Sequence, residues 1–171
     1  MEIPIRIRKS TLEDLPYILR IFDSAREYMR FHRNYSQWND SYPSENDILK
    51  DISEDHSYVG VDSEGEIIMT FAFIKGEDPT YKNIFDGDWL NKNPYGTIHR
   101  IASNGKIPGV LKAACEYCFS ETGNLRIDTH KDNYPMLHAL NKLGFIKCGI
   151  ILCRDGSPRI AFQKIKNENG K

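Results

Sequence analysis

The chain has neither a surplus of one charge nor a block of like charges. Its 171 residues include 23 lysines and arginines against 24 aspartates and glutamates, without a run of five or six like charges. Proteins that bind nucleic acid usually carry a basic patch or stripe. The most basic stretch, residues 4–9, alternates its charges with Ile5 and Ile7, which favours a strand. We therefore expect no nucleic-acid partner.

Long apolar runs are also missing. The longest run, residues 67–74, is interrupted by Thr70 and is far shorter than the ~18 residues that a membrane helix needs. Residues 1–4 lead into alternating charge rather than into the apolar region of a signal peptide. We expect a protein of the cytoplasm without a membrane partner.

Cysteine is scarce, with four residues in the chain. Cys115 and Cys118 have the spacing of a zinc half-site, although such pairs usually lie on turns. Both belong instead to an apolar stripe at helical spacing: Leu111, Ala114, Cys115, Cys118 and Phe119. Cys148 and Cys153 fall in a strand-like segment. We expect reduced cysteines in the core, no disulfide and no metal.

Apolar periodicity predicts alternating strands and helices in a single domain over residues 1–171, with a core of about 3–166. Capping boxes are predicted at Ser10 with Glu13 and at Ser44 with Asp47. The expected strands are 3–8, 57–62, 66–75, 96–103, 125–129, 146–153 and 159–165. The expected helices follow residues 10, 44, 109 and 133, and residues 31–43 and 76–95 are irregular.

The helix from Asn133 to Gly144 carries the most information. Asn133 or Asp132 can cap its first turn, where Pro135 loses no hydrogen bond. Gly144 tolerates a positive φ and ends the helix. One apolar face holds Met136, Ala139, Leu140 and Leu143.

This segment resembles the acetyl-CoA-contacting helix of the GNAT acyltransferase superfamily. That helix usually has Asn first, a small residue three positions on, Tyr seven positions on and Gly-Phe at its end. Asn133 and Gly144-Phe145 match, whereas Met136 and Leu140 replace the small residue and the Tyr. The order of elements over residues 3–166 is also similar to that of the superfamily. The resemblance implies an α/β fold of the α+β type, with a mixed, mostly antiparallel sheet of about seven strands and helices on both faces.

A glycine-containing turn before residue 110 forms a second motif. A helix start offers unpaired amides to phosphate, and Gly105 and Gly109 permit close approach. The GNAT pyrophosphate loop usually reads Gln or Arg, two residues, Gly, one residue, then Gly or Ala. Aligned on Gly109, Lys106 takes the basic position and Leu111 the last small one, so the match is partial. Alternatively, Lys106 is a solvated turn residue.

The resemblance implies that acetyl-CoA is the co-substrate and that it lies between the strands preceding the two helices. The implied contacts are Ile101, Ala102, Ser103, Lys106, Pro108, Gly109, Val110, Leu111, Asn133 and Met136.

The candidate catalytic residues are His99, Asp128 and Ser103. Attack by an amine needs a proton acceptor, and imidazole ordinarily titrates near neutral pH. His99 is alternatively a hydrogen-bonded strand residue. For Asp128 three roles are open: it accepts a proton, it pairs with Arg126, or it caps the next turn. Ser103 or the backbone amides near it are the candidate donors to the oxyanion. Leu140 removes the usual acid for the leaving thiolate.

The two irregular segments are expected to form the acceptor pocket. Trp38, Tyr42 and Trp89 are the candidate substrate contacts, although aromatic residues in loops also pin loops to the core. Acidic residues in the second segment either attract a cationic amine or are simply solvated: Glu77, Asp78, Asp86 and Asp88.

The sequence thus predicts a GNAT-type N-acetyltransferase that moves acetyl from acetyl-CoA to a primary amine of a small molecule or peptide. Leu111 and Leu140 motivate an alternative, a non-catalytic acyl-CoA-binding or partner-binding domain of the same fold. A third interpretation is a nucleotide-binding domain that uses the Gly109 turn. A homodimer is compatible with all three.

Overall fold

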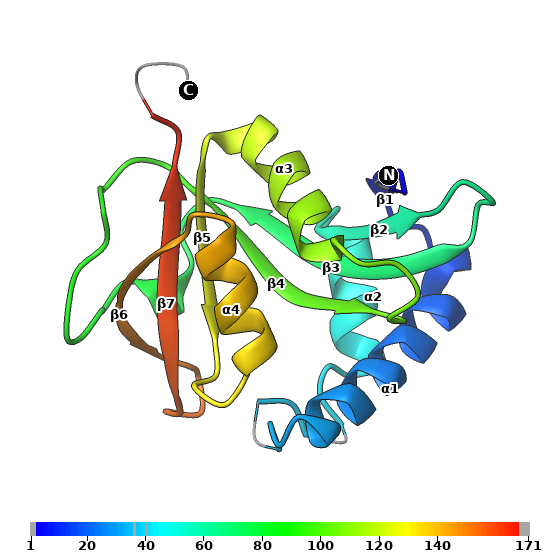
Figure 1. Cartoon of the computed structure of the whole chain (residues 1–171), viewed down its shortest axis with the longest axis horizontal. Coiled ribbons are helices and arrows are strands. Elements are labelled where there is room, and N and C mark those ends of the chain that lie inside the picture. Colours follow the sequence, from blue (N-terminus) through cyan, green and yellow to red (C-terminus); the bar gives the residue numbers. More distant parts are fainter. Residues whose placement is uncertain (1–2, 36, 40, 168–171) are drawn as a thin grey trace.

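A computed structural model describes residues 3–35, 37–39 and 41–167. They form one seven-stranded sheet in the order β1-β2-β3-β4-β5-β7-β6 (Figure 1). Its strands are β1 (Arg6–Lys9), β2 (Ser57–Val61), β3 (Ile67–Lys75), β4 (Gly96–Ser103), β5 (Asn124–Thr129), β6 (Ile146–Leu152) and β7 (Pro158–Ile165). The β4–β5 pair is parallel and the other neighbouring pairs are antiparallel. The expected mixed, mostly antiparallel sheet is confirmed.

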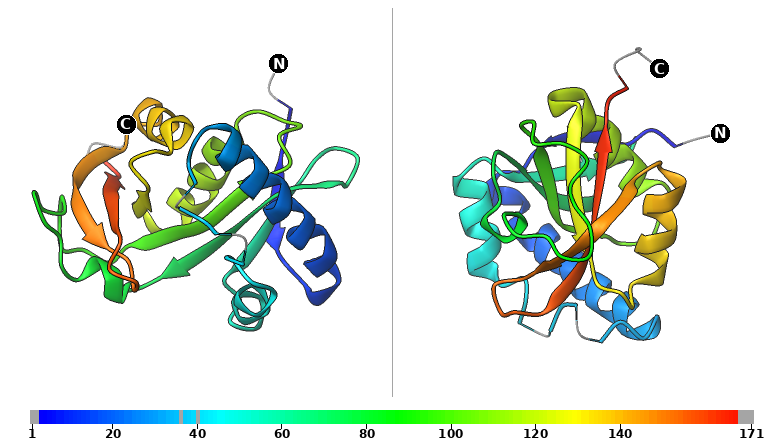
Figure 2. Two further views of the ribbon diagram at one scale, coloured as in Figure 1. Left: turned by 90° about the horizontal axis from the view of Figure 1, so that it is seen from below. Right: turned by 90° about the vertical axis from the view of Figure 1, so that its left-hand side faces the viewer.

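Helices cover both faces of this sheet (Figure 2). They are α1 (Leu15–Phe31), α2 (Glu45–Ser53), α3 (Val110–Thr122) and α4 (Tyr134–Lys142). Short 3-10 turns are η1 (Leu12–Asp14) and η2 (Pro79–Tyr81). Consecutive strand residues point to opposite faces, so Val59 packs with α1 and α2 whereas Tyr58 packs with α3.

The core therefore has a layer on each face, and a third apolar cluster lies under the connection 76–95. Tyr81, Tyr95, Ile151 and Ala161 form this cluster. A predicted loop is thereby packed on the sheet across β6 and β7. It approaches β6 through backbone hydrogen bonds between Phe85 and Ile150, 2.8 Å in each direction.

The first helical segment starts one residue later than predicted. Thr11 and Asp14 form the capping box, in which the Thr11 amide donates to Asp14 Oδ2 at 2.8 Å. Ser10 Oγ instead accepts a hydrogen bond from Ser57 Oγ at 2.9 Å. The predicted box of Ser10 with Glu13 was wrong because Ser10 is bonded to β2.

Cys115 and Cys118 lie on the buried side of α3, as predicted. Burial raises the pKa of both thiols, to about 12 for Cys115. The described residues contain no group of three or more histidines, cysteines or acids arranged to hold a metal ion. Within the same part of the chain, no helix has the length and apolar character required to cross a membrane.

Candidate functional site

β4 and β5 pair over only a short stretch at their beginnings. Gly96 pairs with Leu125 and Thr97 with Arg126, and beyond these pairs the two strands separate (Figure 1). Separation leaves backbone groups on their inner edges without the partners of a continuous ladder. α3 and α4 begin shortly after these strands, so the carboxyl ends of the strands and the two helix starts border the same opening. Ligands of α/β proteins commonly bind at such a place.

A β-bulge redirects the side chains of β4. The register with β3 shifts between Thr70 and Ala72, and Arg100 has a φ of +52°. A bulge re-aims side chains, and here both His99 and Arg100 are directed to the face that carries α2 and the connection 76–95. Two adjacent polar side chains thus reach one side of the opening.

His99 is held by Asp78 of the connection. His99 Nε2 lies 2.7 Å from Asp78 Oδ2, and Asp78 Oδ1 accepts from the Thr80 amide at 2.8 Å and its hydroxyl at 2.7 Å. Burial opposes ionisation of Asp78, but the hydrogen bonds from His99 and Thr80 outweigh it and lower the pKa of Asp78 to about 2. Asp78 is therefore an anion at neutral pH. Nδ1 of His99 has no hydrogen-bond partner among the described residues.

Asp128 projects from β5 toward the same connection. Its Oδ1 accepts a hydrogen bond from the Tyr81 hydroxyl at 2.6 Å, and its Oδ2 is unbonded within the described part of the chain. The alternative pairing with Arg126 is not formed. The Arg126 guanidinium lies 4.1 Å from the ring centroid of Trp89 and 3.9 Å from that of Tyr95. Asp128 thus keeps one free carboxylate oxygen.

Ser103 lies at the other end of β4, away from this pair. Its Oγ accepts a hydrogen bond from the Gly105 amide at 3.3 Å, which ties it to the turn before α3. Ile101 packs against the α3 side of the core and Ala102 against the α1 side. The structure therefore places His99 and Asp128 together but sets Ser103 apart.

The turn before α3 leaves its helix start open. Gly109 is the N-cap residue, with a φ of +83° and no side-chain cap, and the first turn holds no acidic residue. Helix starts without a cap leave their first amides unpaired, which favours an anion. A Cβ at Gly105 or Gly109 would meet no atom within 4 Å, so the backbone is accessible there. Lys106, predicted to face phosphate, forms an exposed ion pair with Glu66.

α4 starts differently because Asn133 caps it. Asn133 Oδ1 accepts from the Met136 amide at 3.3 Å, and its Nδ2 donates to Gln37 Oε1 at 3.1 Å. The predicted cap is confirmed, while the predicted contact with acetyl-CoA stays a prediction. Leu140, which replaces the Tyr usual at this position of the GNAT helix, is fully buried and packs in the core.

Gln37 is a residue that the sequence did not single out. Its Oε1 accepts four hydrogen bonds of 3.1–3.2 Å, from Asn34 Nδ2, Thr129 Oγ1, the His130 amide and Asn133 Nδ2. This side chain joins the loop after α1 to the end of β5 and the start of α4. No periodicity or motif marks a glutamine in an irregular segment, so only the fold identifies it.

The three aromatic candidates for substrate contact all touch protein. Trp38 packs edge-on against Phe22 at 5.5 Å between ring centroids. The Tyr42 hydroxyl accepts from Arg100 Nη1 at 3.3 Å, and Trp89 Nε1 donates to the Tyr81 carbonyl at 3.0 Å. These contacts support the alternative that the aromatic residues pin the loops, most clearly for Trp38 and Trp89.

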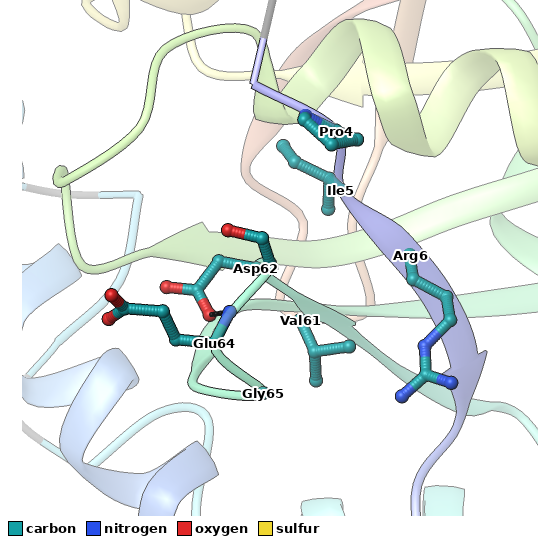
Figure 3. A pocket seen from close by; sticks show the side chains of 8 residues that line it. Pro4, Ile5, Arg6, Val61, Asp62, Glu64 and Gly65 are labelled. Carbon is teal, nitrogen blue, oxygen red and sulfur yellow. Dashed lines mark hydrogen bonds between the residues drawn. The ribbon is translucent and has the colours of Figure 1, made fainter.

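A surface hollow at the β1 edge of the sheet is unrelated to these residues. It lies between the β1 segment, with Pro4 and Ile5, and the β2–β3 turn, with Asp62 and Glu64 (Figure 3). None of the predicted site residues lines it. The site is therefore assigned to the opening between β4 and β5.

Comparison with known proteins identifies the family. No protein-family model and no curated protein matches the chain. Among solved structures, a GNAT-family acetyltransferase from Streptococcus agalactiae 2603 shares 34% identity over 96% of each chain, with a TM-score of 0.85. The chain belongs to the GNAT acetyltransferase family. The predicted family and acyltransferase class of this GNAT enzyme are confirmed.

More distant GNAT structures share the fold. A GNAT-family acetyltransferase from Listeria monocytogenes 4b F2365 has 15% identity over 94% of each chain and a TM-score of 0.69. The ribosomal-protein-S5-alanine acetyltransferase from Vibrio fischeri has 16% identity over 98% of this chain and 95% of its own, with a TM-score of 0.59. At such low identity these two structures support the architecture alone.

Proposed function

We propose that this GNAT enzyme transfers an acetyl group from acetyl-CoA to a primary amine of a small molecule or peptide. One observation carries the proposal: the opening between β4 and β5 has an uncapped helix start at one end and two polar side chains, His99 and Asp128, on one face. The first feature suits a polyanionic ligand, and the second suits an amine that must lose protons.

The residues around the opening fit acetyl-CoA. The amides that follow Gly109 would hold the pyrophosphate, and Gly105 and Gly109 leave room for it. The inner backbone edge of β4 from Ile101 to Ser103 would bind the pantetheine arm, because β5 has separated from it there. When bound, acetyl-CoA supplies an activated acetyl thioester.

The protein would supply proton transfer and orientation. His99 Nδ1 would accept a proton from the amine, and Asp128 Oδ2 would be a second acceptor on the neighbouring strand; the other polar atom of each side chain is already bonded, to Asp78 and Tyr81. The Ser103 hydroxyl and the amides near it remain the candidate donors to the oxyanion. Because Leu140 is in the core, the thiolate has no side-chain acid at that position.

The proposal is tested by measuring coenzyme A release from the purified enzyme with acetyl-CoA and a panel of amines. We expect turnover with at least one primary amine and thermal stabilisation by acetyl-CoA. Tight binding of acetyl-CoA without turnover on any amine would indicate the non-catalytic alternative. Stabilisation by nucleotides but not by acetyl-CoA would indicate nucleotide binding.

Replacing His99 tests the proton acceptor. His99→Ala should lower turnover by roughly 100-fold or more, because general-base catalysis contributes roughly 10²–10⁴. The dissociation constant for acetyl-CoA should stay within about twofold, since His99 points to the acceptor face. His138→Ala, at an exposed position on α4, is the control. Unchanged turnover of His99→Ala would exclude His99 from proton transfer.

A cytoplasmic location is part of the same proposal. The four cysteines are unpaired and three of them are buried, which is typical of a reducing compartment. The amine panel identifies the acceptor by the amine that gives turnover. Sedimentation of the purified enzyme measures whether it forms a homodimer.

A further inference from the structure

One turn of the connection 76–95 touches both separated strands. Asp78, the N-cap residue of η2, bonds His99 of β4 at 2.7 Å, and Tyr81, its last residue, bonds Asp128 of β5 at 2.6 Å. Three residues complete one turn of a 3-10 helix, so positions 78 and 81 project from the same side. A single short element therefore holds the two candidate catalytic side chains.

His99 and Asp128 occupy equivalent positions on their strands. The last paired residues are Thr97 and Arg126, and each candidate lies two residues further along on the same face. Beyond that pair, strand pairing no longer fixes the distance between β4 and β5. No hydrogen bond joins His99 to Asp128 within the described structure, so η2 is the element that bridges them.

The turn itself is firmly anchored. The Asp78 amide donates to the Tyr95 hydroxyl at 2.8 Å, and the Tyr81 carbonyl accepts from Trp89 Nε1 at 3.0 Å. Asp78 Oδ1 is bonded to both the amide and the hydroxyl of Thr80. Tyr81 is 1% exposed. The positions of the Asp78 and Tyr81 side chains are thus set before any ligand binds.

The connection is attached to the sheet at other points as well. Phe85 and Ile150 exchange backbone hydrogen bonds, and the Leu90 amide donates to Gln163 Oε1 at 2.8 Å. Arg126 Nη2 donates to the Asn91 carbonyl at 2.9 Å. These bonds hold the segment through its backbone. The side-chain bonds of Asp78 and Tyr81 are therefore available for another role.

We propose that Asp78 and Tyr81 are positioning residues for acyl transfer, which rests on the proposed function. Asp78 orients the His99 ring with Nε2–H on its carboxylate, so that Nδ1 is the proton acceptor. Tyr81 orients Asp128 so that Oδ2 binds the ammonium group of a cationic primary amine. The acceptor class is accordingly an amine that arrives protonated.

The proton balance of the reaction follows from these roles. An ammonium group bonded to Asp128 gives one proton to His99 Nδ1 and becomes a neutral amine. The amine nitrogen forms the N–C bond to the acetyl carbon while the C–S bond breaks. A second nitrogen-bound proton goes to the sulfur, directly or through water. The products are the amide, the thiol and a His99 imidazolium paired with Asp78.

The charged and titratable groups near His99 come from four elements. Asp78 and Tyr81 belong to the connection, Arg100 follows on β4, and Asp51 of α2 is bonded in two places by Arg100. Asp128 faces the opening from β5. Asp78 is the acid bonded directly to the ring. Burial and the neighbouring Asp128 raise the pKa of Tyr81 well above its usual value, so this hydroxyl stays a donor at neutral pH.

Asp78→Asn tests the orientation of His99. It keeps the shape and removes the anion that stabilises imidazolium, so kcat should fall at least 10-fold. The acidic limb of the kcat/KM profile should move to lower pH, and the acetyl-CoA dissociation constant should stay within twofold. Asp78→Glu should restore part of the activity. Glu13→Gln is the control, since this carboxylate on η1 is exposed and has no bonded partner in the described structure.

Tyr81→Phe tests the orientation of Asp128. The ring keeps its packing against Trp89 and Tyr95 while the hydroxyl is lost. KM for the amine should rise about 10-fold with kcat changed less than threefold. Tyr17→Phe, at an exposed position on α1, is the control. Thermal melting of each variant reports whether the fold is retained.

The outcomes separate the inference from the proposed function. A wild-type enzyme without turnover on any amine overturns both. Wild-type turnover combined with an unshifted pH profile in Asp78→Asn and an unchanged amine KM in Tyr81→Phe overturns the inference alone. In that case the two side chains serve only to pin the connection. A shifted profile and a raised amine KM with unchanged acetyl-CoA affinity establish the positioning roles.

Discussion

At the scale of single residues, Arg100 combines a strained backbone with a fixed side chain. Its φ of +52° is unfavourable for a side chain with a Cβ, by roughly 1–2 kcal/mol. Two bonds to Asp51, of 2.9 and 2.7 Å, hold the guanidinium between β4 and α2. The bulge that directs His99 to the face carrying the connection 76–95 is thus stabilised by a bidentate ion pair with another element.

Asp51→Asn should be strongly destabilising. The change leaves the largely buried Arg100 charge without its counterion, and breaking a buried pair in this way costs about 3–5 kcal/mol. Urea unfolding at pH 7 measures the loss. Glu121→Gln removes the partner of Lys75 from an ion pair in which both side chains are exposed, and it should cost less than about 1 kcal/mol. Equal effects of the two variants would show that the Asp51 pair does not support the bulge.

At the scale of elements, the two helix starts beside the opening are built for different tasks. α4 has a side-chain cap from Asn133, whereas α3 starts at Gly109 without one. Local sequence was sufficient to predict the first, because Asn133 with Pro135 two residues later has a strong capping signature. The open start of α3 was predictable only as a glycine-containing turn.

Gly109→Ala tests the open helix start. A Cβ there meets no atom, so the expected cost of about 1–2 kcal/mol comes from the left-handed backbone conformation. Gly65→Ala in the β2–β3 turn is a matched control, with a φ of +84° and equally open surroundings. Both variants should lose similar unfolding free energy, but only Gly109→Ala should weaken acetyl-CoA binding in calorimetry. Equal acetyl-CoA affinity in the two variants would contradict a phosphate contact at this turn.

At the scale of the whole molecule, Gln37 connects segments from three parts of the chain. Its side chain accepts bonds from the end of β5 and the start of α4, and its carbonyl accepts from Arg159 Nη2 of β7 at 3.3 Å. The loop that was predicted to border the acceptor pocket is thereby tied to α4.

Gln37→Leu should loosen this junction. It removes the acceptor from the His130 amide, the Thr129 hydroxyl and Asn133 Nδ2, at an expected cost of about 1–3 kcal/mol. Hydrogen exchange should become faster at the His130 amide and at the first turn of α4. Asn39→Ala, at an exposed position of the same loop, should leave this exchange unchanged. Unchanged exchange in Gln37→Leu would show that the junction is held by packing alone.

The sequence by itself determined the elements and the family resemblance. Local sequence encodes the local properties of the chain: its apolar periodicity, the Ser44–Asp47 capping box, the Asn133 cap and the positive φ of Gly144. Only the tertiary structure decided which polar groups meet at the site. Asp78 and His99 lie 21 residues apart, and Tyr81 and Asp128 lie 47 apart, so no local pattern records their contacts. Their bonds depend on where β4 and β5 separate and on how the connection packs across them, which the chain settles only when it folds.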